Sequence, residues 1–453
     1  MSDNNRVVVI GSGAAGTAAA RTLKLAGWDV TVADPGRIGG TCLWYGCMPK
    51  KALYNAARAY RTAARAEMFG LTGLPGFDWQ SVLAWKWHAQ ETYAGDQAAG
   101  FADRGIRLIA GEARFVAPDE IEIAATGERL GFDHAVVATG SAPVMPSITG
   151  IELADTSTDA LGYPAPPATL LVVGGGFIGI ELATVYASFG TKVTVVTSGS
   201  RALEMLDEEI ASVALTRLER MGVALHTSCR LTGLSGVPGA IDATVTGADG
   251  SPLAGNWERV LMAVGRRTAH NSLELDAAGV QMDGSGRPVL DDALCSTNPR
   301  VWFAGDAAGG MMQTPAANYM GRTVASSIAS GSPVAVDTSV IPTCLFTTPQ
   351  IAQVGLTEVQ AHAAGLEVDV SRVDFDYSGA AVIEDERDGM VKFVFAADDG
   401  DGRLLGAHIA GPTASDLVYA MALAIRHGAT RDSLRDTVGI HPAYCEMLHR
   451  AAF

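Results

Sequence analysis

Two glycine-rich turns of the same design, beginning at Gly11 and at Gly174, constrain this chain more than any other feature. The first turn, residues 11–16, follows the apolar run Val7–Ile10 and opens a helical stretch, after which a second strand ends at Asp34. Glycines let the backbone turn tightly and let a pyrophosphate approach the N-terminus of the helix. This order of elements therefore predicts a βαβ unit that binds a dinucleotide.

The second turn, residues 174–179, stands in the same context between the strand-like runs 170–173 and 192–196. A carboxylate at the end of the second strand normally accepts hydrogen bonds from ribose hydroxyls. Asp34 has that place in the first unit, whereas Thr197 has it in the second. Two such units imply two dinucleotides, a bound flavin and a nicotinamide carrier. The alternative is that one turn is vestigial.

Composition excludes several classes of protein. The chain has 453 residues, 48% of them hydrophobic and 18% charged, which is enough apolar material for several cores. The net charge of −16 argues against nucleic acid or an anionic membrane as partner. Six cysteines do not make a disulfide scaffold. We find no signal-peptide pattern and no stretch long and apolar enough to span a membrane, and we expect a cytoplasmic protein.

Cys42 and Cys47 stand close together directly after the first βαβ unit. A cysteine pair beside a bound redox ring can store two electrons as a reversible disulfide. The alternatives are a structural disulfide and half of a zinc site. Zinc usually takes two to four residues between its cysteines and a second pair elsewhere, so we expect no metal here.

The rest of the chain changes character near residue 340. Before that point we expect helices over 53–65 and 80–102, strands over 105–115 and 120–123, and a buried strand over 301–306 that ends on Gly-Asp. After it we expect strands over 351–354, 391–396 and 404–409, then helices over 415–427 and 432–438. This pattern predicts an α+β tail distinct from the doubly wound parts.

These residues resemble a known family. The resemblance is carried by Gly39–Lys51, both glycine-rich turns, Ala138–Pro143, Val264–Arg267, Gly305-Asp306, Thr314-Pro315 and Phe346–Glu358. In order and spacing they are similar to the class I pyridine nucleotide-disulfide oxidoreductases, which include glutathione reductase, dihydrolipoamide dehydrogenase and mercuric reductase. The resemblance covers essentially the whole chain.

The resemblance implies an α/β fold with two Rossmann-like dinucleotide-binding domains and a C-terminal α+β dimerisation domain. The expected parts are an FAD-binding domain (1–145), an NAD(P)H-binding domain (146–270), a central segment that completes the FAD domain (271–336) and the dimerisation domain (337–453). It also implies a homodimer whose active site is shared between subunits, and a small-molecule disulfide as substrate.

The same resemblance assigns catalytic roles. Cys47 would face the flavin and form the charge-transfer thiolate, while Cys42 attacks the substrate. His441, in a His-Pro…Glu motif that carries Ala443 where the family usually has Thr, would move the proton, with Glu446 orienting its ring. Since the thiolate is the nucleophile, we expect a nearby imidazolium and the flavin to lower the cysteine pKa values.

Further residues are expected at the cofactors. Lys51 and Glu181 would form an ion pair beside the flavin ring and the nicotinamide, where a positive charge favours the reduced flavin. The expected FAD-binding residues are Gly11, Ser12, Gly13, Ala14, Ala15, Gly16, Asp34, Gly40, Thr41, Lys51, Thr139, Gly140, Asp306 and Thr314. The expected NAD(P)H-binding residues are Gly174, Gly176, Ile178, Gly179, Glu181, Thr197, Ser198, Arg201 and Gly265.

The choice of nicotinamide rests on three residues at the end of the second strand. The acid expected of an NAD enzyme is absent at Thr197, and the arginine expected of an NADP enzyme is absent at Ser198. With no acid to repel a 2′-phosphate and with Arg201 nearby, we favour NADPH over NADH. The alternative is that Arg201 is an ordinary residue at the start of a helix.

For the substrate, the leading interpretation is a glutathione reductase-like enzyme. Arg21 stands where glutathione reductases carry an arginine that meets a glutathione carboxylate, although a solvated helix arginine is the alternative. Trp44 and Tyr45 would add an aromatic wall beside the cysteines. A second interpretation is a dihydrolipoamide dehydrogenase, and a third, of another class, is a non-catalytic flavin redox sensor. No C-terminal cysteine pair like that of mercuric reductase is present.

Overall fold

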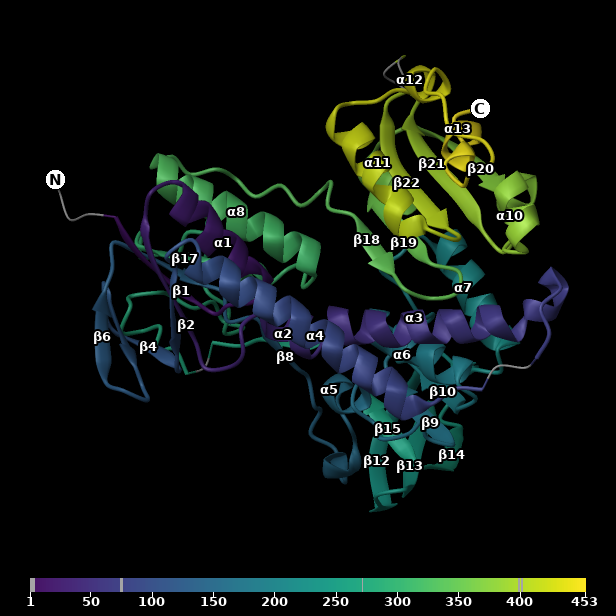
Figure 1. Cartoon of the computed structure of the whole chain (residues 1–453), viewed down its shortest axis with the longest axis horizontal. Coiled ribbons are helices and arrows are strands. Elements are labelled where there is room, and N and C mark those ends of the chain that lie inside the picture. Colours follow the sequence, from purple (N-terminus) through teal and green to yellow (C-terminus); the bar gives the residue numbers. More distant parts are fainter. Residues whose placement is uncertain (1–4, 74–75, 271, 398–399, 401) are drawn as a thin grey trace. The chain divides into compact units, whose positions relative to one another are not determined.

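The computed structural model describes residues 5–73, 76–270, 272–397, 400 and 402–453, and the chain divides into two compact units (Figure 1). Unit 1 contains Met1–Leu53, Gln80–Val144 and Gly265–Asp337, and unit 2 contains Tyr54–Trp79, Met145–Val264 and Thr338–Phe453. The chain changes unit at 144/145, 264/265 and 337/338, close to the boundaries expected from the sequence. It also changes unit inside two helices, at 53/54 and 79/80. The four-part division itself stays a prediction.

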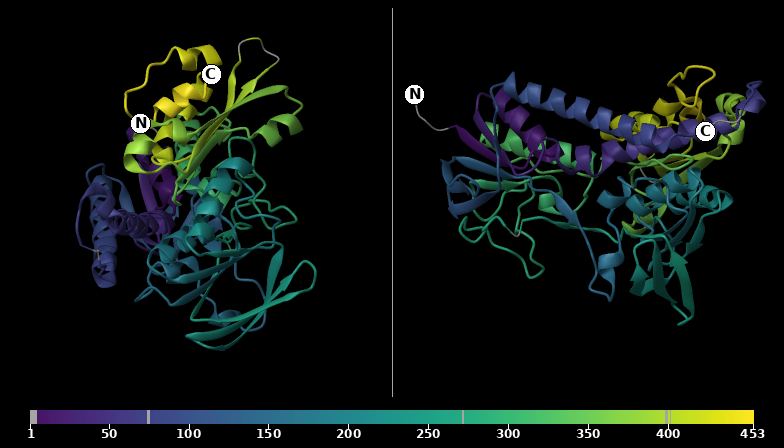
Figure 2. Two further views of the ribbon diagram at one scale, coloured as in Figure 1. Left: turned by 90° about the vertical axis from the view of Figure 1, so that its right-hand side faces the viewer. Right: turned by 60° about the horizontal axis from the view of Figure 1, so that its bottom comes forward.

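Unit 1 is built on a parallel five-stranded sheet. Its order is β17 (Val301–Phe303), β7 (His134–Val137), β1 (Arg6–Ile10), β2 (Asp29–Asp34) and β3 (Arg107–Ala110). Strand β1 is buried from Val7 to Ile10, as expected of a strand covered on both faces. Helices α1 (Ala14–Leu25) and α8 (Thr314–Ser330) lie side by side (Figures 1 and 2). They pack closely because Gly321 has no side chain to meet the backbone of Ala15.

Smaller elements complete unit 1. Strands β4 (Ala113–Ala117), β5 (Glu120–Ile123) and β6 (Glu128–Gly131) form an antiparallel sheet, and β8 (Ser141–Pro143) pairs antiparallel with β16 (Arg266–Thr268). The helices are α2 (Gly40–Trp44), the start of α3 (Cys47–Ala64) and nearly all of α4 (Trp79–Ala102). The strand expected over 105–115 is two strands, because the chain turns at Gly111 and Glu112.

Unit 2 contains a second parallel sheet, of order β11 (Ala224–His226), β10 (Lys192–Val196), β9 (Thr169–Val173) and β15 (Arg259–Met262). Helices α6 (Phe177–Ser188) and α7 (Glu208–Arg220) accompany it. An antiparallel sheet of β12 (Cys229–Val237), β13 (Ala240–Gly247) and β14 (Pro252–Trp257) shares one hydrophobic core with the parallel sheet. The sequence analysis had not foreseen this sheet.

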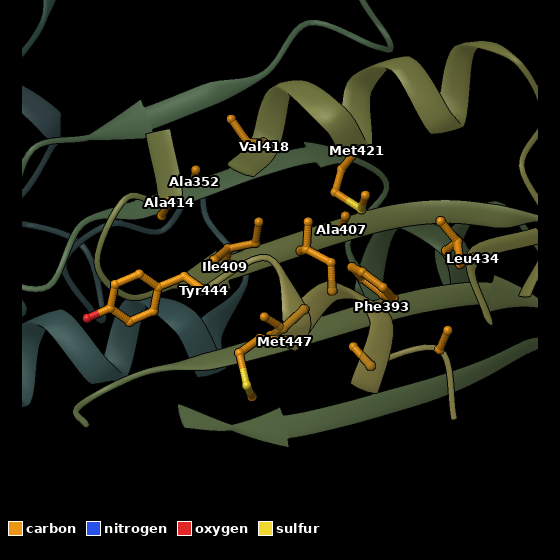
Figure 3. Packing of buried hydrophobic residues seen from close by; sticks show 14 of the residues in the cluster. Ala352, Phe393, Ala407, Ile409, Ala414, Val418, Met421, Leu434, Tyr444 and Met447 are labelled. Carbon is orange, nitrogen blue, oxygen red and sulfur yellow. The ribbon is translucent and has the colours of Figure 1, made fainter. Parts of the chain in front are cut away.

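The C-terminal part of unit 2 is an antiparallel sheet with helices packed against it. The order is β18 (Thr343–Leu345), β19 (Ile351–Gly355), β22 (Leu404–Ala410), β21 (Met390–Ala396) and β20 (Val368–Asp374). Figure 3 shows Val418 and Met421 of α11 (Ala414–Arg426) and Met447 of α13 (Glu446–Arg450) packed with Phe393 and Ile409 of the strands. This is the α+β tail expected after residue 340.

Two expectations for the tail differ from the structure. The helix expected over 432–438 is only α12 (Arg431–Arg435), because the residues after it have no buried face, and Val438 is 93% exposed. Two short helices, α9 (Glu358–Ala363) and α10 (Gly379–Glu384), interrupt the region expected to be strands. In α9 a capping box between Thr357 and Gln360 explains where the helix begins. Of the helices that the structure describes, none has the length and apolar character needed to cross a bilayer.

Candidate functional site

The redox loop, residues 39–47, joins the first βαβ unit to helix α3. Cys42 lies in the short helix α2, and Cys47 is the first residue of α3. Both are thiols in this structure, and the Cys42 thiol is hydrogen-bonded to that of Cys47. Cys47 is exposed, and its Sγ lies 3.1 Å from Thr314 Oγ1, at the start of α8. The fold thus brings together three residues that the sequence analysis had assigned to one site.

The surroundings of Cys42 within this chain raise the pKa of its thiol. The hydrogen bond with Cys47 raises it most, followed by burial and by the negative charge of a Cys47 thiolate. Thr314 and Lys50 act in the other direction. Because a negative charge on one sulfur disfavours a negative charge on the other, the two cysteines do not ionise independently.

A polar chain lies near the cysteines. Ser141 Oγ donates a hydrogen bond to Asp306 Oδ2, and Arg266 donates to Ser141 Oγ (2.7 Å) and to the Ser141 carbonyl (2.6 Å). Burial lowers the pKa of Arg266, while the charges of Asp306 and Cys47 raise it. Asp306 was expected at the flavin, but Arg266 and Ser141 were missed as its partners. Both lie in short segments that carried the family resemblance, and that was the available signal.

The first turn has the geometry of a phosphate-binding site. Gly11 has φ +106°, and any side chain there would overlap the carbonyl of Ala138. Nothing lies within 4 Å of where a side chain on Gly13 would begin. Ser12 donates to Asp34 Oδ2 through its backbone N–H (2.6 Å) and its hydroxyl (2.7 Å). The acid at the strand end is therefore fixed against the turn itself.

The residues around the first turn fit a bound FAD. Helix α1 begins at Ala14, so its first N–H groups face the open space at Gly13. Thr139 Oγ1 is buried and has no hydrogen-bond partner among the described residues. A buried hydroxyl without a partner is costly, and a flavin dinucleotide would satisfy it. Gly40 of the redox loop packs against Gly13, which places the cysteines next to this turn.

The second turn repeats this backbone design. Gly174 has φ +121°, and a side chain there would overlap the carbonyl of Ala263. The position of a side chain on Gly176 is again open. Gly265, which was expected at the nicotinamide nucleotide, belongs to unit 1, so its role there stays a prediction.

Arg201 is bonded to the backbone of its own loop. Its guanidinium donates to the carbonyls of Leu203 (2.8 Å), Glu204 (3.0 Å) and Leu206 (2.8 Å). These bonds hold the loop of residues 201–207 in place. The expected role of Arg201 at the nucleotide stays a prediction.

The loop held by Arg201 brings an acid to the end of strand β10. A Cβ built on Gly199 would lie 2.9 Å from Glu204 Oε2, and Ser200 Oγ lies 3.3 Å from Glu204 Oε1. The carboxylate of Glu204 therefore lies over the residues that follow Thr197. The sequence analysis missed it because the acid comes from further along the chain than the strand end itself.

Glu181 is buried in helix α6, with 2% of its surface exposed. Its Oε1 accepts a hydrogen bond of 2.8 Å from the backbone N–H of Phe346. Lys51 lies in the part of α3 that belongs to unit 1. The expected ion pair between Lys51 and Glu181 stays a prediction.

His441 and Glu446 form the pair expected from the C-terminal motif. His441 Nδ1 lies 2.9 Å from Glu446 Oε1, and the N–H of Ala443 donates to Glu446 Oε2 at 3.1 Å. The hydrogen bond from His441, then that from Ala443, lowers the pKa of Glu446. A carboxylate at Nδ1 leaves Nε2 as the nitrogen that can exchange a proton, and the His441 side chain is 77% exposed.

Two side chains expected near a substrate contact helix α4 or its neighbours. Arg21 has its guanidinium 5.9 Å from the centre of the Phe101 ring, against helix α4. Trp44 is buried, and Arg37 stacks on its ring at 3.7 Å, so Trp44 is no aromatic wall beside the cysteines. Tyr45 remains exposed. Apolar packing against α4 explains the position of Trp44.

Comparisons with known proteins agree with this geometry. Residues 5–321 match the family model "Pyridine nucleotide-disulphide oxidoreductase", and residues 341–452 match the dimerisation domain of the same family. A dihydrolipoyl dehydrogenase from Halobacterium salinarum is 34% identical over 461 residues, covering 100% of this chain and 96% of that protein. A mercuric reductase from Streptomyces lividans is 33% identical, covering 98% and 95% respectively.

A solved structure is also similar. The HOCl-induced flavoprotein disulfide reductase RclA from Escherichia coli aligns with a TM-score of 0.88 at 26% identity, over 99% of both chains. The similarity spans the FAD-type turn, the cysteine pair and the C-terminal motif, and relatives of this kind are NAD(P)H-dependent disulfide oxidoreductases that use FAD. The chain therefore belongs to the pyridine nucleotide-disulphide oxidoreductase family.

Proposed function

We propose that this enzyme passes two electrons between NADH and a small dithiol–disulfide pair of the dihydrolipoyl kind, through Cys42 and Cys47. The observation that carries the proposal is the hydrogen bond between these two thiols, beside Thr314 and next to the first turn. Bound FAD would supply the two-electron carrier between the nicotinamide and the sulfurs.

The cysteine pair exchanges electrons with the substrate by thiol–disulfide exchange. A substrate thiolate attacks the Cys42–Cys47 disulfide and forms a mixed disulfide with Cys42, and Cys47 leaves as a thiolate. The second substrate thiolate then attacks the mixed disulfide, so that the substrate is oxidised to its disulfide and the pair is reduced to two thiols. The raised pKa of Cys42 favours its protonated form once the pair is reduced.

His441 and Glu446 manage the protons of this exchange. Glu446 holds Nδ1, so Nε2 can take a proton from a substrate thiol and return it to a leaving thiolate. By the family resemblance, His441 would act on the cysteines of a second copy of the chain. In support, the apolar side chains of Val438 and Ile440, which flank this motif, are strongly exposed, as expected of a surface that another subunit covers.

The second turn favours NADH. An acid at this edge accepts the ribose hydroxyls of NAD and repels the 2′-phosphate of NADP. Glu204 brings a carboxylate there, while Arg201 is occupied by backbone carbonyls. The sequence analysis favoured NADPH because no acid ends the strand and because Arg201 is nearby. The structure gives reason to change both premises, so we propose NADH.

The choice of a dihydrolipoyl substrate over glutathione rests on two lines of support. Curated relatives named dihydrolipoyl dehydrogenase cover nearly the full chain at 34–35% identity. The arginine that suggested a glutathione carboxylate, Arg21, lies over Phe101 instead.

Steady-state kinetics with the holoenzyme tests the proposal. We expect turnover with NAD⁺ and dihydrolipoamide to exceed that with NADPH and glutathione disulfide. The variant Cys42→Ser should lose about 10³-fold or more of the disulfide turnover because the sulfur that forms the mixed disulfide with the substrate is gone. NADH should still bleach its yellow colour, since that step does not need Cys42. Full disulfide turnover by Cys42→Ser would remove the proposal.

A further inference from the structure

Helix α4 reaches the redox loop through a buried amide. Gln90 is 1% exposed, and its Nε2 donates to the carbonyls of Leu43 (2.8 Å) and Trp44 (3.2 Å). These are the two residues directly after Cys42, at the end of helix α2. The last carbonyls of a helix have no partner within it, so the amide satisfies groups that would otherwise be buried unpaired.

The direction of the Gln90 amide is set by its surroundings. Two carbonyl oxygens can be met only by the N–H groups, because the opposite orientation would place three oxygens against one another. The consequence is that Gln90 Oε1 is buried without a hydrogen-bond partner among the described residues. An unsatisfied buried oxygen costs free energy. The fold retains this cost at the side chain whose N–H groups bind the redox loop.

A second set of contacts holds the same segment of the chain against helix α4. Trp44 Nε1 donates to the carbonyl of Ile38 (2.9 Å), and Arg37 stacks on the Trp44 ring at 3.7 Å. Arg37 in turn pairs with Glu91 of α4, the neighbour of Gln90, at 2.5 Å. Leu43 and Trp44 pack on Ala94, one turn further along α4. Both ends of the segment that carries Cys42 are therefore tied to one helix.

We infer that Gln90 is a positioning residue for the cysteine pair: by holding the Leu43 and Trp44 carbonyls it keeps Cys42 within reach of Cys47 and so favours disulfide formation. Gln90 touches neither sulfur in the contacts that the structure describes and acts through the backbone of α2. This inference rests on the proposed redox role of the pair. It adds that Gln90 shifts the equilibrium between the dithiol and the disulfide.

The physical reason is the entropy of ring closure. When the two thiols give up two electrons and two protons, the new S–S bond closes a small ring through residues 42–47. A loop that is already held in place loses less freedom on closure than a loop that moves. Releasing the loop should therefore lower the equilibrium constant for the reaction of the dithiol with glutathione disulfide, which yields the Cys42–Cys47 disulfide and two glutathione molecules.

Two variants of the holoenzyme test the inference. Gln90→Met keeps the volume of the side chain without its donors, and Gln90→Asn keeps the amide but is too short to reach both carbonyls. Each variant is equilibrated without oxygen in glutathione buffers, free thiols are trapped by alkylation, and the peptide that contains both cysteines is weighed. We expect the equilibrium constant to fall about threefold to tenfold, where tenfold corresponds to about 30 mV.

The control is Gln97→Met, which removes the same amide from α4 where the described contacts include none with α2. It should leave the equilibrium constant as in the unmodified enzyme. An unchanged or higher constant in a folded, FAD-loaded Gln90 variant would overturn the inference, even if that variant melts at a lower temperature. If the unmodified enzyme never forms the Cys42–Cys47 disulfide in any buffer, the proposed function fails and the inference fails with it.

Discussion

The first turn, in unit 1, and the second turn, in unit 2, share a backbone design but obtain their acids differently. In the first, Asp34 ends the second strand and accepts two hydrogen bonds from Ser12 of the turn itself. In the second, the strand ends at Val196 and is followed by Thr197, and the carboxylate comes from Glu204, on a loop that Arg201 holds closed. The position of the acid is thus a property of the folded loop rather than of the strand.

The two acids are also anchored differently. Asp34 is held by its own turn. The loop that bears Glu204 is tied down at its end, where Asp207 pairs with the buried Lys392 of the C-terminal sheet at 2.9 Å. Glu209 bonds the same lysine at 2.5 Å. The comparison teaches that the second site depends on distant parts of unit 2, whereas the first is nearly self-contained.

The largest effect is expected when one methyl group is added to either turn. Gly11→Ala should leave the purified protein with less than about a tenth of the normal FAD, because alanine is strained at positive φ and its methyl group overlaps Ala138. Gly174→Ala should keep the FAD but raise the KM for NADH about tenfold or more. Absorbance per chain and steady-state kinetics measure the two outcomes.

Each variant is the control for the other. A Gly11→Ala protein as yellow as the unmodified enzyme, or a Gly174→Ala protein that loses its flavin while keeping its KM for NADH, would show that the turns are not assigned to these cofactors.

A smaller effect is expected from the acid of the second turn. Glu204→Arg should raise the ratio of kcat/KM for NADPH to that for NADH about tenfold, because attraction to the 2′-phosphate replaces repulsion. Glu204→Gln should raise the ratio only about twofold to fivefold, since the site is exposed and partly screened. Saturation curves with both nucleotides give the ratio.

Glu208→Arg is the matched control, since it makes the same charge change at an exposed position at the start of α7. If Glu208→Arg shifts the ratio as much as Glu204→Arg, the effect is one of overall charge, and Glu204 does not select the nucleotide.

The smallest expected effect concerns the anchor of this loop. Hydrogen bonds from Arg372 and then Lys392 lower the pKa of Glu209 from 4.5 to about 2. A carboxyl with a depressed pKa in the folded state stabilises the fold above its unfolded pKa, and this contribution is lost as the pH falls from near 4.5 towards 2. Because the Glu209 side chain is 37% exposed, the contribution should be under about 1 kcal/mol.

Glu209→Gln should therefore melt at a lower temperature than the unmodified enzyme at pH 6 and show a smaller further drop between pH 5 and pH 3. Thermal unfolding across this range checks it. Glu219→Gln, at an exposed position of the same helix, should behave as the unmodified enzyme. If the melting temperatures of Glu209→Gln and the unmodified enzyme fall in parallel as the pH is lowered, Glu209 does not stabilise this loop.

The sequence predicted the parts of the site whose members are close along the chain. Cys42 and Cys47, and His441 and Glu446, each stand five positions apart, so local geometry alone brings them near each other. The spacing of the motifs that resemble the family also indicated Asp306 as a candidate site residue. The sequence did not reveal that Arg266 and Ser141 serve that carboxylate, since the link between them is the pairing of β8 with β16.

Some side chains have partners that the sequence did not reveal. Arg201 was expected to bind a phosphate, and in the structure it donates to carbonyls of its own loop. Trp44 was expected beside the cysteines, but its apolar ring gains more from burial against α4. The pKa of Cys42 is raised chiefly by its hydrogen bond with Cys47 and by burial, both of which the fold sets.

By itself, the sequence determined the two βαβ units, the redox pair and the motif at the C-terminal end, because each depends on the order and spacing of neighbouring residues. Only the tertiary structure decided that Glu204 lies over the residues that follow Thr197, that the Gln90 amide holds the redox loop and that Arg201 donates to carbonyls of its own loop. Those are contacts between segments that the chain brings together by burying apolar surface, and the side chains left polar at such contacts bond whatever the fold places beside them.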